Sequence, residues 1–204
     1  MAALAAFGVR LHTGWAALVA VTGEPGRLEV LLRRRIELLP TDNSVPRFAY
    51  HHAAELPASQ AAELIERAEA ASQEAARIAV SEVRDHLRPF DFVVKGVGIP
   101  AGSKPIPEDL AIVLGSHPLL HAAEAALFRQ ALALACKNCG LAVISVRERE
   151  VWVEAAATWE LKEAGLRREV DGFRKSLGAP WGTDQKTAAA FALLALNSSG
   201  ELDG

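Results

Sequence analysis

The sequence predicts an α/β fold: a mixed sheet, with an N-terminal antiparallel hairpin and parallel strands, and helices on both faces. Two extended apolar runs, 7–21 and 27–38, flank Thr22-Gly-Glu-Pro-Gly26, a turn sequence typical of a β-hairpin. Further along the chain, segments with helical periodicity alternate with short apolar runs. This alternation is typical of strands connected through helices, so we expect these strands to lie parallel in the same sheet.

The elements after the hairpin follow from periodicity and from the prolines and glycines at their ends. Apolar residues at spacings of three and four predict a long helix over 57–87, with Pro57 in its first turn and Pro89 beyond its end. The rest of the chain predicts, in order, a strand over 90–97, a Pro/Gly-rich loop over 98–107, a helix from 116 or 117 to 138, a strand over 141–146, charged helical segments over 148–177 and a last helix from 183. A third extended segment is expected over 45–51.

Length and composition indicate one globular domain over residues 1–196, followed by a flexible tail over 197–204. The chain has 204 residues, half of them hydrophobic, and a compact chain of this size buries roughly 70% of its unfolded surface. Its core therefore needs no disulfide or metal. The net charge of −3, from 25 acidic and 22 basic residues, excludes a protein that coats nucleic acid non-specifically, because that affinity comes from neutralised phosphates. Any contact with nucleic acid must then be local.

The absence of targeting signals indicates a cytoplasmic protein without a membrane segment. The apolar residues 1–7 lack a basic segment, and no uncharged apolar run approaches 18 residues. Cys136 and Cys139 form a CxxC motif at the end of a predicted helix, where the helix dipole opposes a thiolate. Since no second cysteine pair completes a zinc site, we interpret them as two ordinary thiols.

Two histidines and a glutamate share one face of the helix expected to end at residue 138. At 100° per residue, His117, His121 and Glu124 fall within roughly 60° of one another, so they can converge on one point. Two imidazoles and a carboxylate are a known ligand set for zinc and for open-sided iron sites. The alternative is structural: His117 caps the helix, a backbone carbonyl satisfies His121, and Glu124 is its ion partner. The histidine-rich segment 50–52 is interpreted as a surface loop.

In Gly8-Val-Arg-Leu-His-Thr-Gly-Trp-Ala16 a glycine turn is followed by a Thr-Gly-aromatic-small run. Over residues 146–196 a strand and a loop and helix segment precede an acidic residue that opens an Ala/Leu-rich helix. The order of elements over most of the chain resembles the ribonuclease H-like fold, and these two segments resemble the first strand and the end of the RuvC-type Holliday-junction resolvases within it. The resemblance implies carboxylates on the first strand, the fourth strand and the last helix, which hold two divalent ions that cleave phosphodiester bonds.

The sequence departs from that pattern at most of the ligand positions. The first strand offers Arg10 and His12 in place of a carboxylate. The fourth strand has none, although Asp91 precedes it, and only Asp184, at the start of the last helix, matches. A chain that keeps one of the ligand positions need not keep the two-metal reaction.

If the resemblance extends to activity, it implies roles for residues at or beside these positions. His12, Asp184 and Lys186 are the candidate catalytic residues, with His12 moving protons and Lys186 neutralising phosphate charge. Arg10 and Thr13 are candidates for binding the substrate. The alternative is that His12 is structural and that Asp184 is a favourable acid in the first turn of a helix. Lys186 lies in that same turn, where the helix dipole disfavours a cation, so we expect it to contact an anion or a carboxylate.

Two functions of different classes are consistent with these observations. The first is a divalent-metal-dependent phosphodiester hydrolase, a nuclease that uses Mg²⁺, Mn²⁺ or Zn²⁺ and acts on nucleic acid through a local site. The second is a catalytically degenerate member of the fold that is kept as a binding or assembly module. The missing strand carboxylates favour the second. The sequence is also compatible with a homodimer, and with a protein or a small molecule as the ligand.

Overall fold

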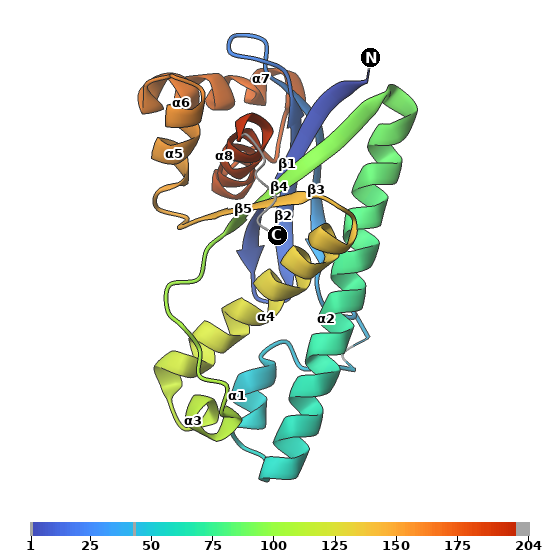
Figure 1. Cartoon of the computed structure of the whole chain (residues 1–204), viewed down its shortest axis with the longest axis vertical. Helices are drawn as coiled ribbons and strands as arrows, with labels where there is room; N and C mark the ends of the chain where they lie inside the picture. The colour runs from blue at the N-terminus through green and yellow to red at the C-terminus, as the bar shows by residue number, and fades with distance from the viewer. Residues whose placement is uncertain (1, 43, 199–204) are drawn as a thin grey trace.

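The computed structural model describes residues 2–42 and 44–198, and its centre is a five-stranded mixed sheet (Figure 1). The strands, in the order in which they lie across the sheet, are β3 (Glu29–Glu37), β2 (Trp15–Thr22), β1 (Ala3–His12), β4 (Phe92–Pro100) and β5 (Ala142–Val146). β1, β2 and β3 pair antiparallel, whereas β4 lies parallel to β1, and β5 lies parallel to β4. The antiparallel N-terminal part and the parallel strands expected from the sequence are confirmed.

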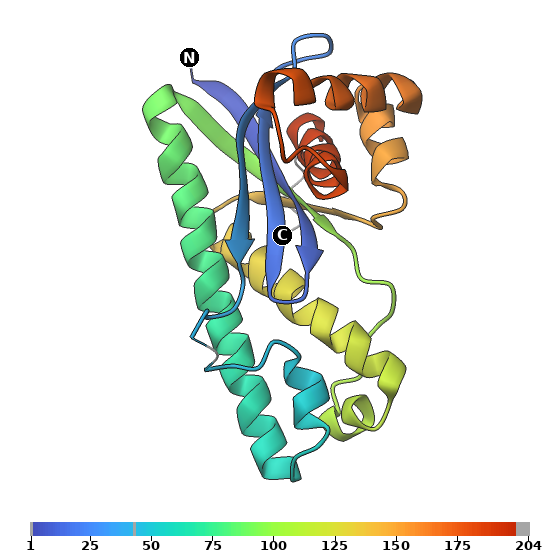
Figure 2. The same ribbon diagram turned by 180° about the vertical axis from the view of Figure 1, so that it is seen from behind.

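Helices cover both faces of this sheet, as expected (Figure 1 and Figure 2). One face carries α2 (Ala58–Leu87), which a short 3₁₀ turn, η1 (Arg88–Phe90), follows, and α4 (His117–Asn138). The other face carries α5 (Val151–Thr158), α6 (Glu163–Gly172), α7 (Arg174–Leu177) and α8 (Thr183–Asn197). Side chains of β1 alternate between the two layers, so that Phe7 packs with α2 and α4 while Ala6 packs with α8.

The apolar run over 7–21, expected as one extended segment, is two strands that meet at a tight turn. β1 ends at His12 and β2 begins at Trp15, and these two residues are paired across the turn. Gly14 has a φ of +79°, a conformation that glycine adopts without the steric cost of a side chain. The apolar sequence conceals the turn because both strands are buried in the core of the sheet.

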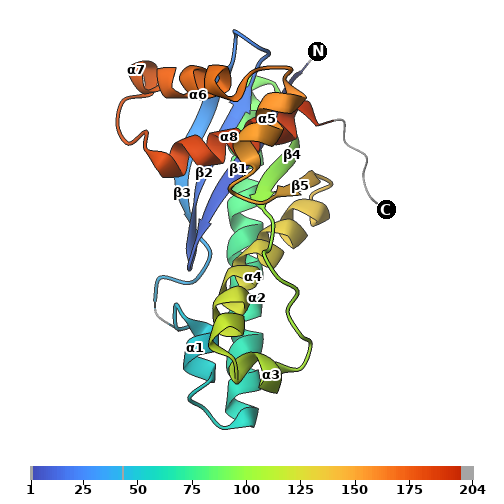
Figure 3. The same cartoon turned by 90° about the vertical axis from the view of Figure 1, so that its left-hand side faces the viewer.

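The third extended segment expected over 45–51 is wrong, because the chain there enters a short helix, α1 (Ala49–Ala53). Glu124 of α4 accepts hydrogen bonds from the backbone N–H groups of Tyr50 and His51, which the start of a helix leaves without partners. α1, α3 (Leu110–Leu114) and the adjoining ends of α2 and α4 pack together below the sheet, and we call this part the helical extension (Figure 3). A contact from a distant helix, not a local pattern, therefore sets the structure of this segment.

α4 is the one helix among the described residues that is long and apolar enough to cross a membrane by length and composition. Of its most apolar stretch, 56% is buried inside the protein, and core helices pass the same test. Cys136, near its end, is wholly buried, and both cysteines are free. Burial raises the pKa of the Cys136 thiol, which is the opposite of what a redox-active thiolate requires.

α8 lies directly against the backbone of the sheet at two glycines. A Cβ atom on Gly8 of β1 would lie 2.2 Å from the carbonyl oxygen of Ala188, and one on Gly98 of β4 would lie 2.1 Å from that of Phe191. This close approach sets the first turn of α8 beside the end of β1. α8 ends at Asn197, and residues 199–204 of the predicted tail lie outside the described residues.

Candidate functional site

Four charged side chains gather where the end of β1 meets the start of α8, and we call Arg10, His12, Glu148 and Asp184 the ion-pair cluster. Alternation along β1 places Arg10 and His12 on the face that α8 covers. Arg10 donates from Nη1 to Oδ1 of Asp184 at 2.5 Å and from Nε to Oε1 of Glu148 at 2.9 Å. His12 Nε2 lies 3.1 Å from the same Asp184 oxygen. Three of the predicted site residues are thus brought together, and Glu148 joins them.

Hydrogen bonds keep both partners of the Arg10–Asp184 pair charged. Partial burial alone would raise the pKa of Asp184, but the hydrogen bonds from Arg10 and His12 outweigh it and lower that pKa below its ordinary value of 3.8. Burial likewise favours the neutral form of Arg10, and its hydrogen bonds to Asp184 and Glu148 outweigh this and raise its pKa. The carboxylate and the guanidinium therefore neutralise each other at neutral pH.

The lowered pKa of Asp184 predicts a contribution to stability that acid removes. The ionised Asp184 carboxylate stabilises the fold fully above its unfolded-state pKa, near 3.8. This stabilisation is lost as the pH falls through the lower pKa of the folded state. We therefore expect the destabilisation caused by Asp184→Asn to be constant from about pH 7 to pH 5 and to shrink below about pH 4. Urea unfolding of both proteins across this range measures it. A difference that grows on acidification would show that Asp184 is not held as a carboxylate.

Trp15 fixes the position of His12. The two rings stack with centroids 4.0 Å apart and an angle of 4° between their planes, as expected for residues paired across the tight turn. The guanidinium of Arg35 lies 4.1 Å from the centre of the same Trp15 ring. His12 is therefore held between an aromatic ring and a carboxylate, which agrees with the structural alternative for this residue.

The other two predicted site residues on these elements point to different partners. Lys186 Nζ lies 2.7 Å from Oδ1 of Asp171 on α6, so the group that it meets is a carboxylate of the protein itself. Thr13 lies in the tight turn, and its carbonyl oxygen accepts a hydrogen bond from Nε of Arg47 at 2.9 Å. Thr13 also lines a cavity of about 190 Å³ together with His12, His121 and other residues of β1 and α4.

The residues at the ion-pair cluster do not fit a pair of Mg²⁺ or Mn²⁺ ions. These ions take oxygen ligands, mostly carboxylates and water. β1 and β4 present no carboxylate, and the one on α8, Asp184, is bound by the Arg10 guanidinium. A fixed cation of the protein thus lies beside Asp184, where the resemblance implies metal ions.

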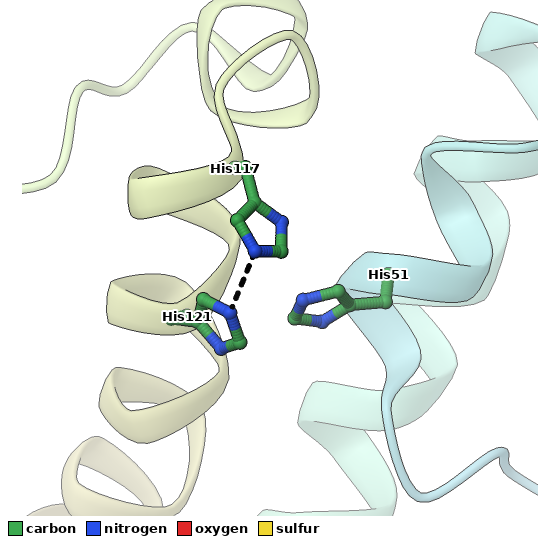
Figure 4. A group of neighbouring side chains, drawn as sticks. All are labelled: His51, His117 and His121. Carbon is green, nitrogen blue, oxygen red and sulfur yellow. Dashed lines mark hydrogen bonds between the residues drawn. The ribbon is translucent and has the colours of Figure 1, made fainter.

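Three histidines gather in the helical extension, and we call His51, His117 and His121 the histidine cluster (Figure 4). The Nε2 atoms of His117 and His121, one turn apart on α4, lie 3.1 Å from each other. The His51 ring projects toward them from α1, and its centroid is 4.7 Å from that of His121. One ligand atom from each ring lies within 4.8 Å of the others.

Glu124, the third residue of the predicted ligand set, does not point into this cluster. Its side chain is buried, with 5% of its surface exposed. Its Oε1 atom accepts hydrogen bonds from the backbone N–H of Tyr50 at 2.8 Å and from that of His51 at 3.2 Å. Nδ1 of His51 is 3.3 Å from the same oxygen. The pKa of Tyr50 is raised to about 12, first by burial and then by the charges of Glu69 and Glu124. Glu124 is thus a partner of α1 and of the His51 ring.

A groove beside the histidine cluster contains a partly buried arginine, Arg129. The groove measures about 470 Å³ and lies between α4 and residues 100–104, and we call it the Arg129 groove. Its charged and titratable lining residues are Arg129, Lys104, His121 and Glu148, and the rest of the lining is small or apolar. Among the described residues Arg129 makes no ion pair or side-chain hydrogen bond, and its partial burial lowers its pKa. Gly102 leaves room for it, since a Cβ there would lie 2.8 Å from Nη2 of Arg129.

Comparison with known proteins finds no matching family model and no matching curated protein. Solved structures that are similar over almost the whole chain include two of Thermus thermophilus RuvC. A Thermus thermophilus RuvC structure is 15% identical over 94% of this chain and 91% of that chain, with a TM-score of 0.46. The T. thermophilus RuvC in complex with a Holliday junction substrate is 16% identical over 95% and 92%, with a TM-score of 0.45. In fold, the chain is distantly similar to RuvC, the group that its first strand and last helix resemble.

Proposed function

We propose that this protein is a catalytically degenerate RNase H-like module that binds a phosphate-bearing strand of nucleic acid without cleaving it. The observation that carries the proposal is the Arg10 guanidinium, 2.5 Å from Asp184. It balances the charge of that carboxylate as a metal ion would. It supplies neither an activated water nor a Lewis acid for phosphodiester cleavage.

The ion-pair cluster has a structural role in this proposal. A guanidinium does not give up its proton in proteins, so Arg10 cannot act as a general base. Its two carboxylate partners come from the start of α8 and from the segment after β5, far apart in the sequence. Arg10 therefore ties these segments to β1.

The Arg129 groove is where we place the phosphate. A partly buried guanidinium without a partner is costly, and a phosphate satisfies it with charge-assisted hydrogen bonds in a planar, two-pronged geometry. Lys104 and His121 line the same groove and add donors. One local site of this kind is consistent with a chain whose net charge is −3. We also propose a cytoplasmic location, since both cysteines are free thiols.

Arg129→Ala is expected to weaken binding of labelled single-stranded and branched DNA about tenfold, because a charge-assisted hydrogen bond contributes about 1.5 kcal/mol. The slope of log affinity against log salt should flatten by about 1, the change expected for one lost phosphate contact. Fluorescence anisotropy at several salt concentrations measures both quantities. Arg77→Ala is the matched control, since Arg77 is exposed on α2 and pairs with Glu74. Equal affinities and slopes for the wild type and Arg129→Ala would refute the placement.

One observation favours a second candidate function, a metal-dependent phosphodiester hydrolase. His121 lines the Arg129 groove and also belongs to the histidine cluster, so a metal held there would lie beside the phosphate. This candidate predicts cleavage that His121→Ala abolishes and that Asp184→Asn leaves intact. The degenerate module predicts no cleavage by any of the three proteins.

A further inference from the structure

We propose that His51, His117 and His121 bind one transition-metal ion of the Zn²⁺ type and that Glu124 positions His51 for it. The proposal does not depend on the proposed function: His121 also lines the Arg129 groove, but the three imidazoles can bind an ion without nucleic acid, and Arg129 takes no part in it. It differs from the ligand set expected from the sequence, in which Glu124 itself would be a ligand.

The spacing of the imidazole nitrogens is close to what such an ion requires. With Zn–N distances of about 2.0–2.1 Å, two ligands of a tetrahedral site lie about 3.4 Å apart. The Nε2 atoms of His117 and His121 are already 3.1 Å apart, and the whole set lies within 4.8 Å. His117 and His121 are exposed, so small rotations of their rings can close the remaining gap.

Glu124 prepares His51 for a metal in two ways. A hydrogen bond from Nδ1 to a carboxylate fixes the ring so that Nε2 carries the free electron pair, as is usual for metal-binding histidines. The second oxygen of Glu124 is buried and has no hydrogen-bond partner among the described residues. A buried carboxylate with an unsatisfied oxygen is costly, and the positive charge of a nearby ion offsets that cost.

The donor set selects the class of metal. Imidazole nitrogen suits Zn²⁺, Cu²⁺ and Ni²⁺, whereas Mg²⁺ and Ca²⁺ take oxygen ligands. Three protein ligands leave the fourth tetrahedral position for water or an exogenous ligand, which the exposure of His117 and His121 admits. Because His51 lies on α1 and the others on α4, the ion would also tie α1 to α4.

The test uses the full-length, tag-free protein, stripped with EDTA and titrated with ZnCl₂ by calorimetry and with CoCl₂ by visible absorption. We expect one ion per chain, the absorption bands of a tetrahedral cobalt site, and a rise in Tm with zinc. His51→Ala, His117→Ala and His121→Ala should each lower the affinity more than about 100-fold, and Glu124→Gln should lower it about 10- to 100-fold. His52→Ala, on α1 but outside the histidine cluster, is the control and should bind like the wild type.

Two results would overturn the site. One is the absence of zinc and cobalt binding by the wild type, and the other is wild-type affinity in all three histidine variants. Melting curves without metal guard against misfolding, because variants of the exposed His117 and His121 should melt like the wild type. Either result leaves the proposed function standing, since that depends on Arg129 and on the absence of cleavage.

Discussion

Gly8→Ala and Gly98→Ala are each expected to lower the free energy of unfolding by more than about 3 kcal/mol, which is the upper end of the usual cost of adding a methyl group to a packed core. The new Cβ would lie 2.2 Å from the carbonyl oxygen of Ala188 or 2.1 Å from that of Phe191. Both are backbone atoms of α8 and cannot rotate away, so the whole helix must move off the sheet. Urea unfolding of the three proteins measures the loss.

Gly165→Ala is the matched control for these substitutions. Gly165 lies within α6, and a Cβ there would meet no atom within 4 Å. Alanine is favoured over glycine inside a helix, so this change should be neutral or stabilise the protein by up to about 1 kcal/mol. If Gly98→Ala is no more harmful than Gly165→Ala, α8 does not lie against the sheet as described.

Arg10→Asp is expected to destabilise the protein by about 2 kcal/mol, between the values for exposed and buried ion pairs. The change removes the cation shared by Asp184 and Glu148 and adds a third negative charge beside them. Three neighbouring carboxylates are the ligands that Mg²⁺ and Mn²⁺ prefer. We therefore expect millimolar Mn²⁺ to restore part of the lost stability in Arg10→Asp and to leave the wild type unchanged.

Arg77→Asp serves as the control for charge reversal. Arg77 and Glu74 are both largely exposed on α2, so this variant should lose far less stability and should not respond to Mn²⁺. Equal losses in the two variants, or stabilisation of the wild type by Mn²⁺, would contradict the view that Arg10 takes the place of a metal ion.

Periodicity was sufficient to predict the long elements of the fold. The helix over 57–87, the helix ending at residue 138 and the start of the last helix at Thr183 lie within a residue or two of α2, α4 and α8. The segments of α2 and α4 have apolar residues at helical spacing and proline or glycine at their ends, whereas α8 is buried all round from Thr187 to Leu196. The apolar run over 7–21 does not reveal the turn at Gly14, because buried strands lie on both sides of it and only the short polar segment from His12 to Gly14 marks it.

The site was only partly predictable, because contacts between distant segments decide it. Spacing on a helix correctly placed His117 beside His121, but it could not show that Glu124 reaches back to α1. His51 lies 66 positions before His117 in the sequence, and no local pattern links them. Lys186 does meet a carboxylate, as its position in the first turn of α8 implied, and that carboxylate is Asp171.

We propose that Arg10 stands in place of the metal ions, so that the protein binds nucleic acid without cleaving it. The decisive measurement is binding and cleavage of the same labelled four-way junction and single strand, with Mg²⁺ or Mn²⁺ present. We expect the wild type to bind these nucleic acids, Arg129→Ala to bind them more weakly, and neither protein to form any product. Product formed by the wild type would contradict the proposal, and loss of that product in Asp184→Asn would place the reaction at the ion-pair cluster.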